Sequence, residues 1–144
     1  MGNSQRNKGA AGERELVKVL NEYGLNTHRG HVFYHEPDVI GLPGIHIEVK
    51  RVEKLDLKKA MDQAVEESLR KDHGTPCVFH RVNRGKWKVT MSWLDFWDYF
   101  FIYQAQSWDY LHVENGMVTT LLSEWIEKYK NIADIPVEKA GMYE

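Results

Sequence analysis

The sequence predicts a single-domain α/β (α+β) fold, with elements in the order α-β-β-β-α-β-β-α followed by a C-terminal extension. Apolar residues recur at helical spacing near the N-terminus, and later apolar runs of strand length are bounded by Pro-Gly and Asn-Arg-Gly turns. An apolar share of 42% in 144 residues is too high for a disordered chain and is enough for one sizeable core.

The elements expected in the first half alternate between helix and strand patterns. Leu16, Val17 and Leu20 share one stripe of a helix that Gly24 can end, and Asp56 can cap a later helix. The predicted elements are a mobile polar arm over 1–8, a helix over 9–23, strands over 26–35, 39–42 and 45–52, and a helix over 57–72.

The second half predicts a hairpin and then an aromatic helix, for which Ser92 and Asp95 form a capping box. The predicted elements are strands over 77–82 and 87–92, a helix over 93–105, a strand over 108–114, a helix over 117–130 and a tail over 131–144. We divide the chain into a core, residues 1–95, and an aromatic, acidic extension, residues 96–144. The extension is expected to pack on the core or to form a dimer interface, because aromatic side chains on all sides of a helix need burial on more than one side.

The charges are unevenly distributed. Residues 1–90 carry a net charge of +4 and residues 91–144 a net charge of −6, which together give −2. A nucleic-acid backbone would therefore meet the first part of the chain. The single cysteine, Cys77, excludes an intrachain disulfide and is expected to be a buried small residue, which fits a reducing cytoplasmic location. No signal peptide, membrane span or membrane partner is expected, because no apolar run approaches the roughly 20 residues that a bilayer requires.

The most informative segment carries two carboxylates and a lysine. Asp38 follows a proline, and Glu48 and Lys50 flank Val49 within an apolar run. Side chains alternate between the faces of a strand, so Glu48 and Lys50 point to the same side. Paired carboxylates can hold a hard cation such as Mg²⁺, and a neighbouring lysine can orient a water or stabilise a phosphate. The grouping indicates metal-dependent phosphodiester cleavage.

A third carboxylate is expected at the same place. At about 100° per residue, Glu13 lies at the centre of the apolar stripe of the first helix, whereas Glu15 points outward. An unpaired buried carboxylate costs several kcal/mol, so a partner such as a metal ion or its waters is expected for Glu13. The alternative is a hydrated acid near the helix start, favoured by the helix dipole.

The segment from Lys8 to Glu15, Lys-Gly-Ala-Ala-Gly-Glu-Arg-Glu, together with Pro37-Asp38 and Glu48-Val49-Lys50, resembles the archaeal-type Holliday junction resolvases of the PD-(D/E)XK nuclease superfamily. It resembles the resolvase-like nucleases often encoded by phages at least as much, and the resemblance covers roughly residues 8–95. A serine-containing loop of that family is not evident before Asp38, and residues 96–144 have no recognised counterpart.

The resemblance implies a restriction-endonuclease-like core, in which a mixed central sheet is flanked by helices and the acids lie at one sheet end. It implies that Asp38, Glu48 and the Val49 carbonyl bind the metal directly, that Glu13 helps to position the metal or its waters, and that Lys50 orients or activates the attacking water. The implied metal is Mg²⁺, which Mn²⁺ can replace. The implied reaction is in-line hydrolysis that leaves a 5′-phosphate and a 3′-hydroxyl.

Further residues are candidates for substrate contact. Gln63, on the helix that follows the lysine strand, either supports Lys50 or is a surface amide, and Trp87 either stacks on an unpaired base or belongs to the core. Zinc at His28, His31, His35 or His46 is not favoured, because cysteines and close motif spacing are lacking. The candidate phosphate contacts are Lys8, Arg14, Arg29, Arg51, Arg81, Arg84 and Lys86.

Three functions follow from these observations. The first is a Holliday junction resolvase that acts on branched DNA as a homodimer, since two active sites suit a two-fold-symmetric junction. The second is a repair or restriction-like nuclease that acts on ends, flaps or mismatches. The third is a catalytically inactive nucleic-acid-binding domain, although inactive members usually lose an acid or the lysine, and here all four residues are present.

Overall fold

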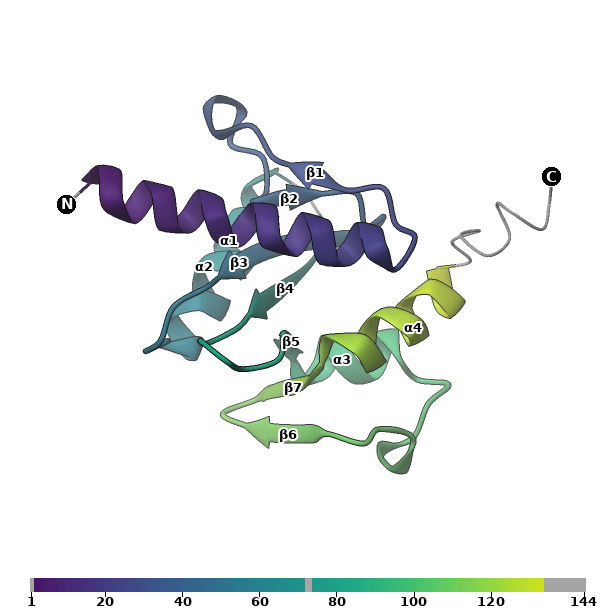
Figure 1. Ribbon diagram of the computed structural model, residues 1–144. Coiled ribbons are helices and arrows are strands. Elements are labelled where there is room, and N and C mark those ends of the chain that lie inside the picture. The colour runs from purple at the N-terminus through teal and green to yellow at the C-terminus, as the bar shows by residue number, and fades with distance from the viewer. Residues whose placement is uncertain (1, 72–73, 134–144) are drawn as a thin grey trace, which may run out of the picture.

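A seven-stranded mixed sheet forms the centre of the computed structural model, which describes residues 2–71 and 74–133 (Figure 1). The strands lie in the order β1-β2-β3-β4-β5-β7-β6. The elements are α1 Gly2–Glu22, β1 His28–Arg29, η1 Val32–Tyr34, β2 Val39–Ile40, β3 Ile45–Lys50, α2 Leu57–Lys71, β4 Thr75–His80, β5 Lys88–Ser92, α3 Trp93–Tyr99, η2 Ala105–Ser107, β6 Leu111–Glu114, β7 Met117–Leu121 and α4 Leu122–Ala133.

The sheet combines one parallel pair with antiparallel neighbours. Strands β3 and β4 run parallel, with Glu48 opposite Val78 and Lys50 opposite His80, and α2 connects them. The pairs β1–β2, β2–β3, β4–β5, β5–β7 and β6–β7 are antiparallel. The predicted mixed sheet flanked by helices is therefore confirmed, and the predicted element order is present with one strand added.

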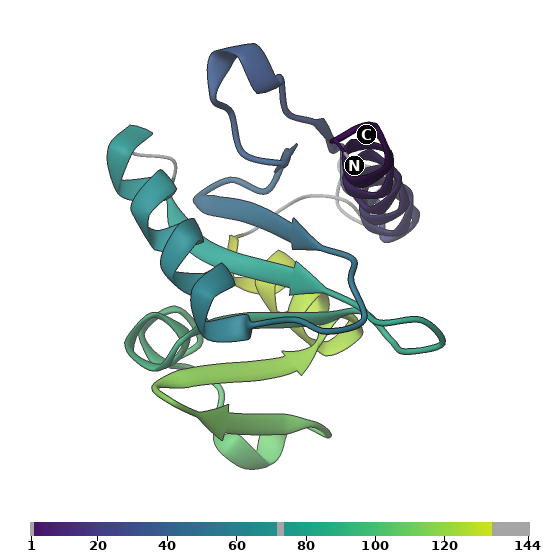
Figure 2. The ribbon, with the colours of Figure 1, turned by 90° about the vertical axis from the view of Figure 1, so that its left-hand side faces the viewer.

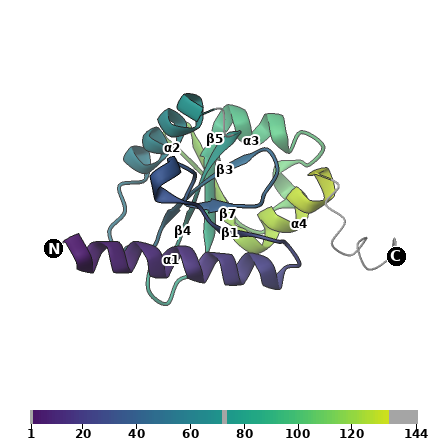
Figure 3. The same cartoon turned by 90° about the horizontal axis from the view of Figure 1, so that it is seen from above.

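Helices cover both faces of the sheet. Helices α1 and α4 lie on one side and α2 on the other (Figures 2 and 3). On the first side, Leu16 and Leu20 pack with Ile47 and Val49 in the main core, which also holds the aromatic residues of α3 and α4. On the second side, a smaller cluster of Ala60, Met61, Ala64, Val78 and Met117 lies beneath α2. The alternation along β3 thus sends apolar side chains toward α1 and leaves the other face for α2.

The first helix begins earlier than the sequence indicated. Residues 2–8, predicted as a mobile arm, form the first turns of α1, which starts at Gly2. The segment contains no proline, and helix propagation adds one hydrogen bond per residue once a packed segment has nucleated it. The polarity of the segment is therefore compatible with a helix that extends beyond its packed part.

The main error in the predicted elements falls on residues 117–130, which were expected to form one helix. The structure has the strand β7, followed directly by α4. Val118, Thr119 and Thr120 are β-branched and favour a strand. Asn115 and Gly116 take positive φ values of 52° and 74°, as a two-residue hairpin turn between β6 and β7 requires. This Asn-Gly signal was available in the sequence.

Two other elements are shorter than predicted. The strand expected over 26–35 contributes only β1, and the chain then forms the short η1 turn. The helix expected over 93–105 ends at Tyr99. Cys77 is fully buried, as predicted. Within residues 2–71 and 74–133, none of the helices has both the length and the apolar character needed to cross a bilayer.

Residues 96–133 are integrated into the same sheet and core as the preceding part. Strands β6 and β7 extend the sheet from β5. Trp125 of α4 packs edge-on against Phe79 of β4 and stacks on Tyr129. The Tyr129 hydroxyl donates to the Pro43 carbonyl at 2.7 Å, which joins α4 to the turn that precedes β3. Residues 134–144 of the predicted tail lie outside the described residues.

The Tyr129–Pro43 hydrogen bond is expected to stabilise the fold measurably. Replacing Tyr129 by Phe removes the hydroxyl but keeps the packed ring, so we expect a loss of about 1 kcal/mol in the free energy of unfolding. Urea unfolding followed by tryptophan fluorescence measures the loss. Tyr34→Phe is the matched control, since that side chain is largely exposed. Equal stability of Tyr129→Phe and the parent protein would contradict the assigned role.

Candidate active site

Four structural elements bring carboxylates together around β3. Asp38 lies just before β2, Glu48 is in β3, Glu13 comes from α1, and Glu67 comes from α2. The charges of Glu13 and Glu67 both act on Asp38, and the charge of Asp38 acts on Glu48. The structure thus brings together the three acids that the sequence singled out and adds a fourth.

Backbone hydrogen bonds fix the position of Asp38. Its Oδ2 accepts from the Val49 N–H at 2.8 Å, and its own N–H donates to the Ile47 carbonyl at 3.2 Å. The Gly30 N–H donates to the Asp38 carbonyl at 3.0 Å. A Cβ on Gly30 would lie only 1.7 Å from the Pro37 oxygen, so only glycine allows this close approach.

Glu48 and Lys50 lie on the same face of β3, as the strand alternation predicted. The Lys50 Nζ is 3.7 Å from Glu48 Oε2 and 3.4 Å from the Gln63 Oε1 on α2. Of the two interpretations of Gln63, the structure therefore supports contact with the lysine. The Lys50 ammonium lies on the solvent side of Glu48, because the Lys50 side chain is 29% exposed whereas Glu48 is 3% exposed.

Glu13 is partly buried and faces Asp38 from α1. Its Oε1 forms an ion pair with the Arg29 Nε at 2.9 Å. A Cβ on Gly12 would lie 2.6 Å from the Arg51 Cβ, so this glycine lets α1 lie directly against the chain at the end of β3. The close approach of the helix explains how a residue of α1 reaches the acids of the sheet.

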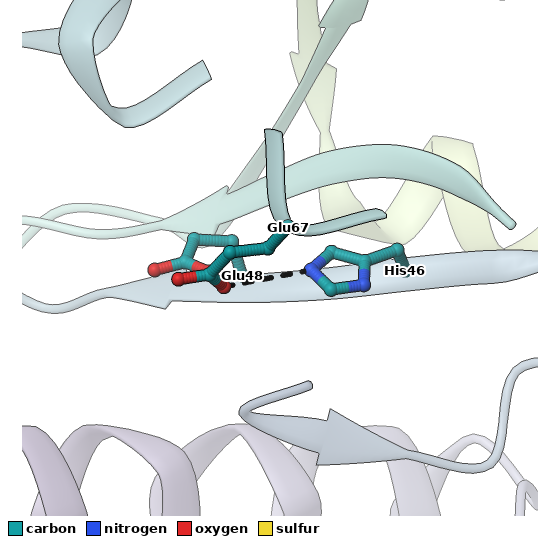
Figure 4. Close-up of side chains that lie close together, drawn as sticks. All are labelled: His46, Glu48 and Glu67. Carbon is teal, nitrogen blue, oxygen red and sulfur yellow. Dashed lines mark ion pairs between the residues drawn. The ribbon is translucent and has the colours of Figure 1, made fainter. Parts of the chain in front are cut away.

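Glu67 is the site residue that the sequence reasoning missed. Its carboxyl group lies within hydrogen-bonding reach of Glu48, and its Oε2 is 3.9 Å from the His46 Nε2 (Figure 4). One ligand atom each from His46, Glu48 and Glu67 lies within 4.8 Å of the others. Gln63 and Glu67 are four residues apart and share one face of α2, so the position of Gln63 was the available signal.

The acids repel one another. Burial raises the pKa of Asp38 to about 6, assisted by the charge of Glu13, while the Val49 N–H opposes the rise. Burial and the charges of Asp38 and Glu67 raise the pKa of Glu48 to about 8, and Lys50 opposes this only in part. The protein itself therefore does not supply enough positive charge for these carboxylates.

The donor set fits a divalent cation. Among the residues the structure describes, Glu48 Oε1 is buried and has no hydrogen-bond partner. An unsatisfied buried carboxylate oxygen is costly, and a cation would compensate it. Asp38 lies against the Val49 backbone and its charge acts on Glu48, so this place offers the oxygen ligands that a hard cation prefers.

Two of the predicted phosphate contacts are engaged within the protein. Glu15, expected to point outward, is partly buried and binds three groups. Its carboxylate accepts from the Arg51 Nε at 3.3 Å, from the Arg81 Nη1 and from the Trp87 Nε1 at 2.8 Å. Trp87 is only 8% exposed and belongs to the core, so the alternative of base stacking by Trp87 is wrong.

The remaining candidate contacts differ in their accessibility. Arg14, Arg84 and Lys86 are exposed, whereas Arg29 is paired with Glu13. The side chain of Lys8 lies outside the part of the chain whose side chains are described. Some of the candidate contacts are thus paired within the protein, and the side chain of one is not described. Arg14, Arg84 and Lys86 are available to solvent.

The loop between β1 and β2 exposes two aromatic side chains that the sequence reasoning did not single out. This loop projects from the sheet and leads directly into Asp38 (Figure 1). Phe33 is 83% exposed and Tyr34 is 69% exposed. Large apolar side chains this exposed beside a polar site indicate a contact surface.

The crowded acids predict an unusual dependence of stability on pH. A carboxyl group whose pKa is raised by folding stabilises the fold at low pH, and this stabilisation is lost as pH rises through the pKa of the folded state. We expect the metal-free protein to lose at least about 1 kcal/mol as pH rises through 6 and toward 8. Thermal melts of the chelator-treated protein across this pH range measure the loss of stability. Melts at pH 8 after addition of excess Mg²⁺ measure its recovery.

Asp38→Asn should flatten this pH dependence, because the substitution removes one of the repelling charges. The matched control is Glu66→Gln, an exposed residue of α2 that pairs with Arg70. A metal-free melting temperature that is constant between pH 5 and 8 would contradict the proposed repulsion. If the melting temperatures of both the parent protein and Asp38→Asn stayed constant with pH, any stabilisation by Mg²⁺ would arise at a different site.

Comparison with known proteins places this chain in a family. The family model described as archaeal Holliday junction resolvase (hjc) matches residues 4–98, which include Glu13, Asp38, Glu48 and Lys50. The 1.6 Å structure of Archaeoglobus fulgidus Hjc, a Holliday junction resolvase from an archaeal hyperthermophile, is similar over 83% of this chain and 88% of that chain, with 21% identity and a TM-score of 0.45. No curated protein sequence matches the chain. The family match covers most of the chain, and the chain belongs to the archaeal Holliday junction resolvase family.

Proposed function

We propose that this chain is a Mg²⁺-dependent endonuclease that cuts four-way DNA junctions at the acid cluster of α1, β2 and β3. The family assigns it to the Holliday junction resolvases, which are nucleases. The observation that carries the proposal is the convergence of Glu13, Asp38 and Glu48 beside Lys50, with a buried oxygen of Glu48 that has no hydrogen-bond partner within residues 2–71 and 74–133.

In this proposal Asp38, Glu48 and the Val49 carbonyl hold Mg²⁺, and Glu13 helps to position the ion or its waters. A bound Mg²⁺ would stabilise charge on the scissile phosphate and lower the pKa of a bound water. Mn²⁺ is expected to substitute, since it accepts the same oxygen ligands.

Lys50 has the geometry to orient the attacking water. Its ammonium group lies between Glu48 and the Gln63 amide oxygen, which restrict its position from two sides. Three donors on the ammonium leave capacity for a water or a phosphate oxygen after these contacts. Gln63 therefore acts as a positioning residue for Lys50 in our proposal.

DNA binding is proposed to use exposed residues around the acids. Arg14, Arg84 and Lys86 can contact phosphates. Arg29 already lies at Glu13, so its guanidinium is close to where a scissile phosphate would bind. Phe33 and Tyr34 are accessible for stacking on bases at a branch point, the role that Trp87 does not take.

We also propose a homodimer, formed through α3 and the residues that follow it. Exposed apolar side chains concentrate there, namely Trp93, Leu94, Phe101 and Ile102. Large apolar side chains exposed on one segment of the chain support a protein contact there. A two-fold dimer would present two active sites to the two opposing strands of a junction.

Cleavage is expected to depend on a branched substrate and on the acids of the site. With Mg²⁺, the protein should nick two opposing strands of a labelled four-way junction and should leave matched duplex and single strands largely intact. Asp38→Asn should lower cleavage by at least about 100-fold while junction binding persists, because the substitution removes a metal ligand and leaves the exposed basic residues in place. Lys50→Ala should lose most turnover, by about 100-fold or more, yet still bind metal.

Asp62→Asn on the exposed side of α2 is the control for both variants. Full cleavage by Asp38→Asn would refute the assigned metal site. Equal cutting of linear duplex by a monomer would instead favour the repair or restriction-like alternative. Junction binding without any cleavage at all would favour the inactive binding domain.

The proposed dimer is expected to depend on the exposed apolar side chains that follow α3. Replacing both Phe101 and Ile102 by Ser should convert the dimer to a monomer, because it removes two exposed apolar contacts from the proposed interface. Sedimentation velocity measures the change, and Val113→Ser on the edge strand β6 is the matched control. A parent protein that sediments as a monomer, or a double variant that remains dimeric, would exclude this interface.

A further inference from the structure

We propose that His46, Glu48 and Glu67 form a second divalent-cation site, on the α2 side of Glu48, that takes a transition metal ion such as Mn²⁺ or Zn²⁺. The site is distinct in its ligands from the oxygen-only set of Asp38, Glu48 and Val49, with which it shares Glu48. It rests on the geometry of these three side chains and does not require the proposed nuclease activity.

The three side chains are close enough to bind one ion. One ligand atom from each lies within 4.8 Å of the others, and the His46 Nε2 is 3.9 Å from Glu67 Oε2. Ligands that each lie about 2.1 Å from one ion are at most about 4.2 Å apart. A shift of roughly half an ångström in a side chain would therefore complete the site.

The site is built into the fold and is not a surface cluster of acids. His46 and Glu48 alternate with core residues on β3, where they are 1% and 3% exposed. Both point to the side of the sheet that α2 covers, and Figure 4 shows Glu67 descending from α2 toward them. The Glu67 side chain is 40% exposed, so an ion can reach the buried ligands past it.

The buried carboxylate of Glu48, which supports a cation on the Asp38 side, also points to a ligand on the α2 side. Among the described residues, the Oε1 of Glu48 has no hydrogen-bond partner, although the side chain is almost wholly buried. Protein interiors rarely leave a carboxylate oxygen unsatisfied. The neighbouring Glu67 adds a second acid instead of a donor, so the two carboxylates together call for a cation.

The ligand chemistry favours a transition metal over Mg²⁺. Mg²⁺ strongly prefers oxygen ligands, whereas an imidazole nitrogen suits Zn²⁺ and similar ions, and Mn²⁺ accepts carboxylates together with histidine. Glu48 would be a ligand common to this site and to the oxygen-only site.

The alternative is a purely structural arrangement, in which Glu48 and Glu67 share a proton and His46 pairs with Glu67. This alternative predicts that the protein binds ions only through the Asp38 side. The two explanations differ in the number of ions bound per chain and in whether nitrogen coordinates one of them.

The decisive experiment measures Mn²⁺ binding by the full-length chain in an excess of Mg²⁺, which fills the oxygen-only site. Pulsed electron paramagnetic resonance should then detect nitrogen hyperfine coupling from one histidine on one bound Mn²⁺ per chain. Glu67→Gln and His46→Asn should weaken this binding by at least about tenfold, which corresponds to about 1.4 kcal/mol. The coupling should persist in Asp38→Asn.

Glu66→Gln is the matched control, because Glu66 is the exposed neighbour of Glu67 and pairs with Arg70. The measurement on the parent protein needs no variant, so unfolding of His46→Asn would not compromise the test. Bound Mn²⁺ without nitrogen coupling, or equal binding by Glu67→Gln, would overturn the second site and leave the proposed function standing. Loss of cleavage in Asp38→Asn with retained nitrogen coupling would establish the two sites separately.

Discussion

The crowding of carboxylates around Glu48 is the constraint on which the structure of this protein depends. A buried acid beside other acids is unfavourable in the absence of a cation, so the surrounding elements must hold it against repulsion. Strand β3 does so from the middle of the sheet, where it is paired with β2 and β4. Helices α1 and α2 add further acids from either side.

The protein treats two glutamates in opposite ways. Glu15 is compensated internally by two arginines and an indole N–H, and it ties α1 to β3 and to the β4–β5 hairpin. Glu48 lies 3.7 Å from one lysine, and one of its oxygens has no hydrogen-bond partner in the part of the chain that the structure describes. The compensated Glu15 therefore has a structural role, whereas the uncompensated oxygen of Glu48 is available for a ligand.

Local sequence patterns predicted the parts of the fold and site that depend on local geometry. The shared face of Glu48 and Lys50 followed from strand alternation, and the inward position of Glu13 followed from the helical period, whereas the inclusion of Asp38 rested on its place in the sequence and on the family resemblance. The role of Glu15 depends on contacts 36, 66 and 72 residues away along the chain, which periodicity does not reveal. The strand β7 was missed because its apolar and β-branched residues run directly into a true helix, and the Asn-Gly turn before it was overlooked.

The packing of α2 on β3 has a consequence for how the site responds to change. Glu48 and Lys50 are two residues apart on a strand, which is about 6.6 Å. Glu67 and Gln63 are four residues apart on a helix, which is about 6 Å along its axis. These two spacings are nearly equal, so Lys50 meets Gln63 and Glu48 meets Glu67. A register shift of α2 by a single residue would turn both partners away together, and the lysine contact and the acid contact would therefore be lost in one step.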